Sequence, residues 1–339
     1  MTKILVIAEA GVNHNGSVGQ AKRLIDVAAD SGADVVKFQT FTAERLVTHN
    51  APKAEYQLET TGADQSQFEM LYALELSAKS HKDLMEYCVE KDLLFLSSPF
   101  DEISADLLED LNVAAFKIPS GEITNLGYLA HIARKNRPMI VSTGMANLEE
   151  VEAAVQIIRQ SGSPKFVLLH CVSNYPANPE DANLRAMSTM ASAFGIAVGY
   201  SDHTLGISTA LAAVALGACV VEKHLTLDKQ LTGPDHLASL EPHEFKTMVE
   251  EIFGPVLTVF KASGLKEAIE ISNNVKLGLS SSIYTKDLTM AFQYINTVEA
   301  GMVHVNAPTL GGEVHLPFGG LKSSGVGQRE QGVEAVDFF

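Results

Sequence analysis

The stretches 197-AVGYSDHT-204 and 218-ACVVEKHLTLD-228, separated by an apolar helical segment, decide how the fold of this chain is interpreted. Each β-like run ends by presenting a histidine, His203 in the first and His224 in the second. If the runs are neighbouring parallel strands, both imidazoles emerge at the same carboxyl edge, where α/β sheets hold their sites. Two imidazoles rimmed by acids suit a divalent cation such as Mn, Fe or Zn. Each histidine could equally be a hydrogen-bonded residue at a strand end, so both interpretations stay open.

The rest of the first 250 residues alternates between β-rich apolar runs and segments of helical periodicity. The predicted strands are Ile4–Ala10, Val35–Thr40, Leu93–Ser98, Ala114–Ser120, Met139–Gly144, Phe166–Val172, Ala197–His203 and Val220–Leu227. The predicted helices are Val18–Ala29, His81–Lys91, Ala105–Leu111, Leu126–Lys135, Leu148–Arg159, Leu184–Phe194, Ser208–Leu216 and one from Pro242 to about Ile252. This alternation predicts an α/β fold, a (β/α)8 TIM barrel, with a doubly wound open sheet as the competing arrangement.

One connection is much longer than the others. The segment Phe41–Leu76 is polar, with TTGADQSQ at its centre. A loop of that length at the catalytic face of a barrel is expected to act as a substrate lid.

The pattern changes after about Glu251, so we expect a barrel over 1–250 and a separate tail over 251–339. In the tail we predict the helices Leu265–Val275 and Leu288–Ala300 and the strands Ser282–Thr285 and Met302–Asn306. A segment of about 88 residues is small for an independent core. We therefore expect a short, incomplete α+β tail that exposes apolar residues such as Val256, Leu257 and Phe260.

Composition limits the classes of function. The 339 residues are 46% hydrophobic and 19% charged, which is typical of a folded globular protein. The net charge of -16 argues against a nucleic-acid partner, although a few lysines focused in a cleft can still hold an anionic substrate. Three cysteines without CxxC spacing indicate reduced thiols. Because the chain starts directly on a strand and has no long apolar span, we expect a cytoplasmic protein without a membrane partner.

Two lysines stand within apolar strand sequence, Lys37 in VVKFQT and Lys117 in AAFKIPS. Such lysines are seldom buried without a partner. They could form internal ion pairs with Glu9, Glu122 or Glu222, or they could clamp the phosphate and carboxylate of a ligand. Both interpretations stay open from the residues alone.

The motifs IAEAGVNHNGS, VVKFQT, FKIPSGE, VSTGM, LHCVSNYPANPED, GYSDHTLG, VEKHLTLD and GPDHLAS together resemble the sialic acid synthase family, which includes N-acetylneuraminate, legionaminate and pseudaminate synthases. The resemblance covers residues 1 to about 250 in unbroken motif order. It implies a (β/α)8 barrel that condenses phosphoenolpyruvate with an N-acetylated hexosamine of the N-acetylmannosamine type, releasing phosphate and giving a nonulosonic acid. It also implies a divalent metal, Mn first and Mg or Co as alternatives, and a homodimer.

Carried over position by position, the resemblance implies a set of site residues. The metal ligands would be His203 and His224. The phosphoenolpyruvate site would comprise Lys37, Ser98, Lys117, Ser120 and Ser201, with Ser173 near a position where some members use Asn. The sugar would contact Gln39, Tyr175 and Asp235, and the active-site acids would be Glu9 and Glu122.

The tail departs from this family, whose members continue into a small antifreeze-like domain that supplies an arginine to the partner subunit. Instead EEIFGPVLTVF, GLSSSIYT, GMVHVNAPT and PFGGLKSSGVGQREQG resemble the C-terminal part of an aldehyde dehydrogenase, as if the chain were a chimera joined near 249–252. We do not expect NAD as a cofactor, because no G-x-G-x-x-G follows the first strand and no cysteine has the dehydrogenase context. The alternative function is a folded but catalytically impaired fusion that binds phosphoenolpyruvate and metal without efficient turnover.

Overall fold

The computed structural model describes residues 4–62, 64–162, 165–253, 261–307, 309 and 321–324. The chain divides into two compact units, Met1–Val256 and Leu257–Phe339. Val256, Leu257 and Phe260, expected to be exposed, lie outside the described residues, as does most of the last tail motif.

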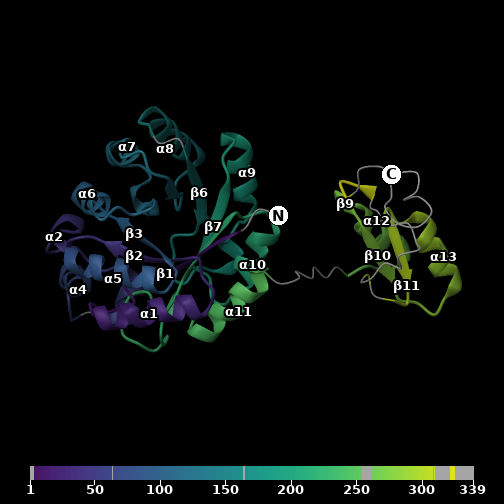
Figure 1. Cartoon of the computed structure of the whole chain (residues 1–339), viewed down its shortest axis with the longest axis horizontal. Helices are drawn as coiled ribbons and strands as arrows, with labels where there is room; N and C mark the ends of the chain where they lie inside the picture. Colours follow the sequence, from purple (N-terminus) through teal and green to yellow (C-terminus); the bar gives the residue numbers. More distant parts are fainter. Residues whose placement is uncertain are drawn as a thin grey trace. The chain divides into compact units, whose positions relative to one another are not determined.

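The first unit is built on eight parallel strands encircled by helices (Figure 1). The strands are β1 (Leu5–Gly11), β2 (Val35–Thr40), β3 (Leu94–Pro99), β4 (Phe116–Ile118), β5 (Met139–Ser142), β6 (Phe166–Cys171), β7 (Val198–Asp202) and β8 (Val220–His224). Their order is β3-β2-β1-β8-β7-β6-β5-β4, and the two end strands lie side by side. The sheet is therefore a nearly closed barrel, and the predicted fold class is confirmed.

Helices follow the strands and cover the outside of the barrel. After β1 and β2 come α1 (Val18–Asp30), α2 (Ala43–Leu46), α3 (Glu55–Thr61), α4 (Gln67–Leu74) and α5 (Ala78–Glu90). The later ones are α6 (Glu102–Asp110), α7 (Leu126–Arg134), α8 (Leu148–Gln160), α9 (Arg185–Phe194), α10 (Ser208–Ala215) and α11 (Pro242–Phe253), with 3-10 helices η1 (Ser120–Glu122), η2 (Pro179–Asp181) and η3 (His236–Ala238). Among the helices of the described residues, none is long and apolar enough to cross a membrane.

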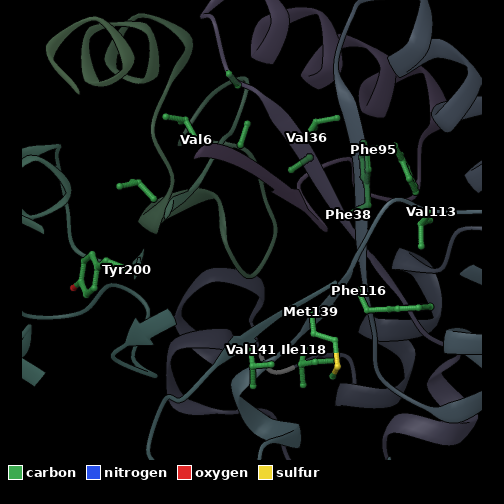
Figure 2. Packing of buried hydrophobic residues seen from close by; sticks show 14 of the residues in the cluster. Val6, Val36, Phe38, Phe95, Val113, Phe116, Ile118, Met139, Val141 and Tyr200 are labelled. Carbon is green, nitrogen blue, oxygen red and sulfur yellow. The ribbon is translucent and has the colours of Figure 1, made fainter. Parts of the chain in front are cut away.

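Alternation along the strands separates two cores. The outward side chains, among them Val6, Val36, Phe116 and Met139, pack under the helices in the main hydrophobic cluster (Figure 2). The rings of Phe38 and Phe95 stack there at a centroid distance of 5.8 Å. The inward side chains form a second apolar layer inside the barrel, made of Ile7, Val35, Leu96, Ile140, Leu169 and Val220. This layer closes the barrel floor, so any cavity must lie above it, toward the carboxyl ends of the strands.

Gly199 shows how crowded that floor is. A Cβ at this position would approach the Val220 carbonyl oxygen to 2.4 Å and Leu169 Cδ2 to 2.7 Å. A residue without a side chain is therefore needed where β7 crosses the apolar layer.

The segment after β2 differs from the polar loop expected there. Residues 41–76 carry the three short helices α2, α3 and α4. The Ser66 hydroxyl accepts a hydrogen bond from the Glu69 backbone N–H, the Glu69 carboxylate accepts one from the Ser66 backbone N–H, and this capping box starts α4. The sequence analysis did not predict these helices, because helices of one or two turns carry too little periodicity to be recognised.

The second unit contains α12 (Leu265–Asn273), β9 (Leu277–Gly278), β10 (Ser280–Ile283), α13 (Leu288–Thr297), β11 (Met302–Val305) and β12 (Leu321–Lys322). β10 and β11 pair in parallel, and β9 pairs with β12 in antiparallel. Its described residues include the exposed side chains of Tyr284, Leu288 and Phe292.

Candidate active site

A polar layer lies directly above the apolar floor of the barrel. On each strand the residue two positions beyond the floor residue faces the same way, because side chains alternate along a strand. This layer comprises Glu9, Lys37, Ser98, Lys117, Ser142, Cys171, Ser201 and Glu222, and all eight line one cavity of about 350 Å³. The volume lies within the range of small-molecule sites.

Two lysines and two glutamates dominate the polar layer of this cavity. Lys37 Nζ lies 2.9 Å from Glu9 Oε2 and 3.5 Å from Glu222 Oε2. Lys117 Nζ lies 3.3 Å from Glu222 Oε1. Hydroxyl groups complete the arrangement, because Lys37 donates to Ser98 Oγ at 3.1 Å and Lys117 donates to Ser142 Oγ at 2.8 Å. The internal ion pairs considered for these lysines are therefore present, and they face the cavity.

Burial acts differently on the two carboxyl groups. Desolvation raises the pKa of Glu9, and Lys37 offsets only part of that effect. Desolvation also acts on Glu222, but Lys117 and Lys37 outweigh it and lower the pKa of that carboxyl. Desolvation lowers the pKa of Lys117. The cavity therefore holds one firmly charged glutamate, one that binds a proton more readily, and two lysines that both contact the Glu222 carboxylate.

The two histidines stand at the upper rim of the same cavity, at the ends of β7 and β8. Their ring centroids are 5.6 Å apart, and both side chains are buried. His203 Nδ1 lies 2.6 Å from the Val172 carbonyl oxygen, which fixes the orientation of the ring. Desolvation lowers the pKa of His203 to about 4 and lowers the pKa of His224 well below its usual value, so both rings are neutral at physiological pH.

These residues fit a divalent cation. Neutral imidazole is the form of histidine that binds a metal, and a buried ring nitrogen, His224 Nδ1, has no hydrogen-bond partner among the described residues. In the part of the chain that the structure describes, no group of three or more His, Cys, Asp or Glu has metal-binding geometry. A cation held by His203 and His224 would therefore take its other ligands from water or substrate oxygens, as Mn and Mg accept.

The three residues expected to contact a sugar also line the cavity. The ring of Tyr175 lies on that of His203 at a centroid distance of 4.2 Å. Gln39 Nε2 donates to Glu9 Oε1 at 3.3 Å. Asp235 Oδ2 lies 3.9 Å from His224 Nδ1, and burial raises the pKa of this carboxyl to about 6.

Ser120 and Ser173 approach each other near the β5 end of the cavity. Their Oγ atoms are 3.4 Å apart, although only Ser120 lines the cavity itself. Gly144 permits this approach: its φ is +49°, and a Cβ there would lie 2.5 Å from Ser120 Cβ and 2.7 Å from Ser173 Oγ.

Glu122 is the one expected acid that the structure does not bring to the cavity. It lies on η1, half-buried, and its Oε2 accepts a hydrogen bond from Asn125 Nδ2 at 3.0 Å. Its neighbours Ser120 and Gly121 line the cavity, whereas Glu122 is not among the lining residues.

Sequence reasoning missed the central position of Glu222. It was considered only as an ion-pair partner, yet it contacts both lysines and accepts a hydrogen bond from Ser201 Oγ at 2.8 Å. The signal was available: Glu222 precedes His224 by two residues, so both side chains face the same side of β8.

Sequence reasoning also missed an apolar wall above the polar layer. A third hydrophobic cluster contains Val12, Phe41, Met70 and Leu74, with Leu46, Leu71 and Phe100 packed against it. Six of these also line the cavity, namely Val12, Leu46, Met70, Leu71, Leu74 and Phe100. Gly16 brings the β1–α1 loop against α4, since a Cβ there would lie 2.4 Å from the Ala73 carbonyl oxygen. The segment after β2 thus presents an apolar face to the cavity.

Comparison with known proteins gives two family matches. Residues 24–264 match the NeuB family, and residues 211–339 match the aldehyde dehydrogenase family. Both resemblances found in the sequence are therefore confirmed.

Individual relatives agree with the first match. The N,N'-diacetyllegionaminic acid synthase of Campylobacter jejuni is 50% identical over 291 residues, which are 85% of this chain and 86% of that protein. The enzyme of the same name from Legionella pneumophila is 53% identical over 251 residues, covering 73% of this chain and 70% of that protein. The crystal structure of a sialic acid synthetase from Leptospira borgpetersenii in complex with citrate superposes with a TM-score of 0.66 at 36% identity, covering 80% of this chain and 92% of that one.

Proposed function

Because the chain belongs to the NeuB family over residues 24–264, we propose that it is an enzyme that condenses phosphoenolpyruvate with an N-acetylated amino sugar to give a nonulosonic acid and phosphate. The observation that carries the proposal is the polar layer of the barrel. Two lysines, several hydroxyl groups and two neutral histidines face one cavity of about 350 Å³. An anion and an aldehyde sugar would meet there above an apolar floor.

The lysines supply the anion site. Lys37 and Lys117 would neutralise the phosphate and carboxylate of phosphoenolpyruvate, and Ser98 and Ser142 already accept hydrogen bonds from them. Because both ammonium groups are buried, their attraction for an anion is much stronger than at a surface. The binding of citrate by the Leptospira relative is consistent with an anion site in this fold.

The reaction forms one carbon–carbon bond. The methylene carbon of phosphoenolpyruvate attacks the aldehyde carbon of the open-chain sugar, water adds to the carbon that carried the phosphate ester, and phosphate leaves by C–O cleavage. Glu9 would take the proton from that water and pass it to the oxygen of the former aldehyde, which becomes a hydroxyl group, since Gln39 and Lys37 hold the Glu9 carboxyl group in the cavity. A divalent metal, Mn first, held by His203 and His224 would supply Lewis-acid polarisation of the aldehyde oxygen.

The far end of the sugar would lie against the apolar wall. The aldehyde group of the sugar must reach the polar layer, so the opposite end of the sugar would point toward α4. Tyr175 and Asp235, on loops at the rim, line the cavity and would contact its hydroxyl and acetamido groups. The names of the Campylobacter and Legionella relatives make a diacetamido sugar the first candidate, with N-acetylmannosamine as the second.

The test is phosphate release from phosphoenolpyruvate, measured with each sugar, with and without Mn. We expect release only when an N-acetylated sugar and Mn are both present, and we expect His203→Ala to abolish the metal-dependent part. No release with either sugar would reject the function.

The alternative of an impaired fusion has a distinct signature. Phosphoenolpyruvate and Mn together would raise the unfolding temperature through binding to the folded state, with no product formed. The aldehyde dehydrogenase match of the tail is the observation that favours testing it.

We further propose that the chain acts in the cytoplasm as a homodimer, without NAD. Size-exclusion chromatography with light scattering tests the dimer, and titration with NAD tests the cofactor. A monomer, or saturable NAD binding, would contradict these points.

A further inference from the structure

An ion pair on the outer face of the barrel stands directly behind the two histidines. Asp202 and Lys223 are opposite each other in the β7–β8 register, each one residue before its histidine. Because side chains alternate, His203 and His224 face the cavity while Asp202 and Lys223 face away from it. Both charged side chains are fully buried, and neither lines the cavity.

The pair ties both sides of His203 to the residue before His224. Lys223 Nζ donates to Asp202 Oδ2 at 2.7 Å and also to the Thr204 carbonyl oxygen. Asp202 Oδ1 accepts from the Thr204 backbone N–H and from Thr204 Oγ1, both at 2.9 Å. One side chain of β8 therefore holds the backbone of β7 immediately before and after His203.

Stability alone does not account for this pair. Burial of two charges carries a desolvation penalty, and replacing such pairs with apolar side chains is often neutral or stabilising. The β7–β8 ladder already continues through Ser201 and Glu222. What the pair adds is a link between the carboxyl ends of β7 and β8, which carry the two imidazoles.

We propose that Asp202, Lys223 and Thr204 are positioning residues that fix the separation of the two imidazoles. The inference rests on the proposed metal site, since a fixed separation matters most when both rings bind one cation. Outer partners that orient metal-binding side chains typically change metal affinity by about 10- to 100-fold when removed.

The decisive variant is the double substitution Asp202→Asn/Lys223→Met. It leaves no charge at these two buried positions, and the Asn side chain keeps an acceptor for Thr204. We expect an unfolding temperature within a few degrees of the parent chain and a Kd for Mn²⁺ about 10- to 100-fold higher, measured by calorimetric titration with the metal alone. The KM for phosphoenolpyruvate should stay unchanged while the Mn²⁺ concentration needed for half-maximal kcat rises.

A matched control removes an ion pair elsewhere on the barrel. Lys135 contacts Asp106 and Glu109 between α6 and α7, so Asp106→Asn/Lys135→Met makes the same two changes of side-chain type in a more exposed ion pair, on helices that do not carry the histidines. We expect this control to leave the Kd for Mn²⁺ unchanged.

A milder variant, Thr204→Val, keeps the charges and removes one hydrogen bond to Asp202. We expect it to raise the Kd for Mn²⁺ by a smaller, few-fold factor, and it provides the test if the double variant fails to fold.

The outcomes separate this inference from the proposed function. A parent chain that does not bind Mn²⁺ would remove the metal site and this inference with it. A parent chain that binds Mn²⁺, together with variants of equal affinity, would overturn the positioning role alone. An affinity loss of equal size in the Lys135 control would also overturn it.

Discussion

Gly144 shows how a single residue shapes the proposed anion site. Its left-handed backbone and its contact with Ser120 and Ser173 exclude any side chain. In Gly144→Ala the new Cβ must displace both serines, which stand at 2.5 and 2.7 Å from it. We expect the KM for phosphoenolpyruvate to rise at least about tenfold, equivalent to about 1.4 kcal/mol, measured by phosphate release.

Gly195 offers the matched control for that substitution. It also has a positive φ, +63°, but nothing lies within 4 Å of the position of its Cβ. Gly195→Ala should therefore carry the backbone strain of about 1 kcal/mol without disturbing the site. If both variants raised the KM equally, strain rather than displacement of the serines would be the cause.

The site residues that lie on strands could be predicted from the sequence, because alternation along a strand tells which side chains face the cavity. The motif set assigned roles to His203, His224, Lys37 and Lys117, and the structure brings all four to one cavity. Glu222 could have been added from alternation alone. Alternation could not have excluded Glu122 from the predicted site residues. The chain leaves β4 after Ile118 and turns into η1, where strand alternation no longer applies.

At the scale of elements, α4 shapes the cavity, because several of its side chains form part of the cavity wall. Met70 and Leu74 are buried against the cavity and form part of its apolar wall. In Met70→Gln an amide replaces the thioether, and an amide buried there without a partner costs about 1–3 kcal/mol. We expect kcat/KM for the amino sugar to fall about tenfold or more, with the KM for phosphoenolpyruvate unchanged.

Tyr72 on the same helix is the control for this variant. It is 63% exposed and lies outside the lining of the cavity. Tyr72→Asn should leave both kinetic constants unchanged. An equal loss for both substrates in Met70→Gln would mean that the substitution disturbs the barrel generally, and thermal unfolding would show it.

The strands were predicted better than the segment that carries α4. β2 was predicted with its observed bounds, Val35–Thr40, because an apolar run bounded by turn residues leaves little choice. β4 is shorter than predicted, since Pro119 lacks a backbone N–H and cannot extend the ladder. The helices of residues 41–76 span four to eight residues, too few for a periodic signal. Apolar packing of this segment against Val12, in the third hydrophobic cluster, stabilises it.

At the scale of the whole molecule, two family matches meet on one chain. The two matches overlap over residues 211–264, and the boundary between the two compact units falls, along the sequence, after residue 256. All eight barrel strands and the proposed site residues lie within the first unit. We therefore propose that the barrel, close to residues 1–250, carries the chemistry and that the tail is a separate fragment.

Acid should destabilise the barrel through its buried histidines, and His14 is the clearest case. Burial lowers the pKa of His14 to about 4, and its Nδ1 accepts a hydrogen bond from the Gly16 backbone that protonation would break. An unfolded histidine has a pKa of about 6.5, so between pH 6.5 and 4 the unfolded chain binds a proton that the folded chain rejects. The contribution of His14 to stability is therefore complete above pH 6.5 and is lost as pH falls through about 4, a change of roughly 3 kcal/mol.

Comparison with His14→Asn isolates this effect, because the Asn oxygen can still accept from Gly16 and does not titrate. Glu9 and Asp235, whose pKa values burial raises, act in the opposite direction, but they are common to both proteins and cancel in the difference. Urea unfolding at several pH values should show a steeper loss of unfolding free energy in the parent chain than in the variant. His243, which is exposed on α11, supplies the control, and His243→Asn should follow the parent curve. Parallel curves for the parent and His14→Asn between pH 6.5 and 4 would refute this assignment.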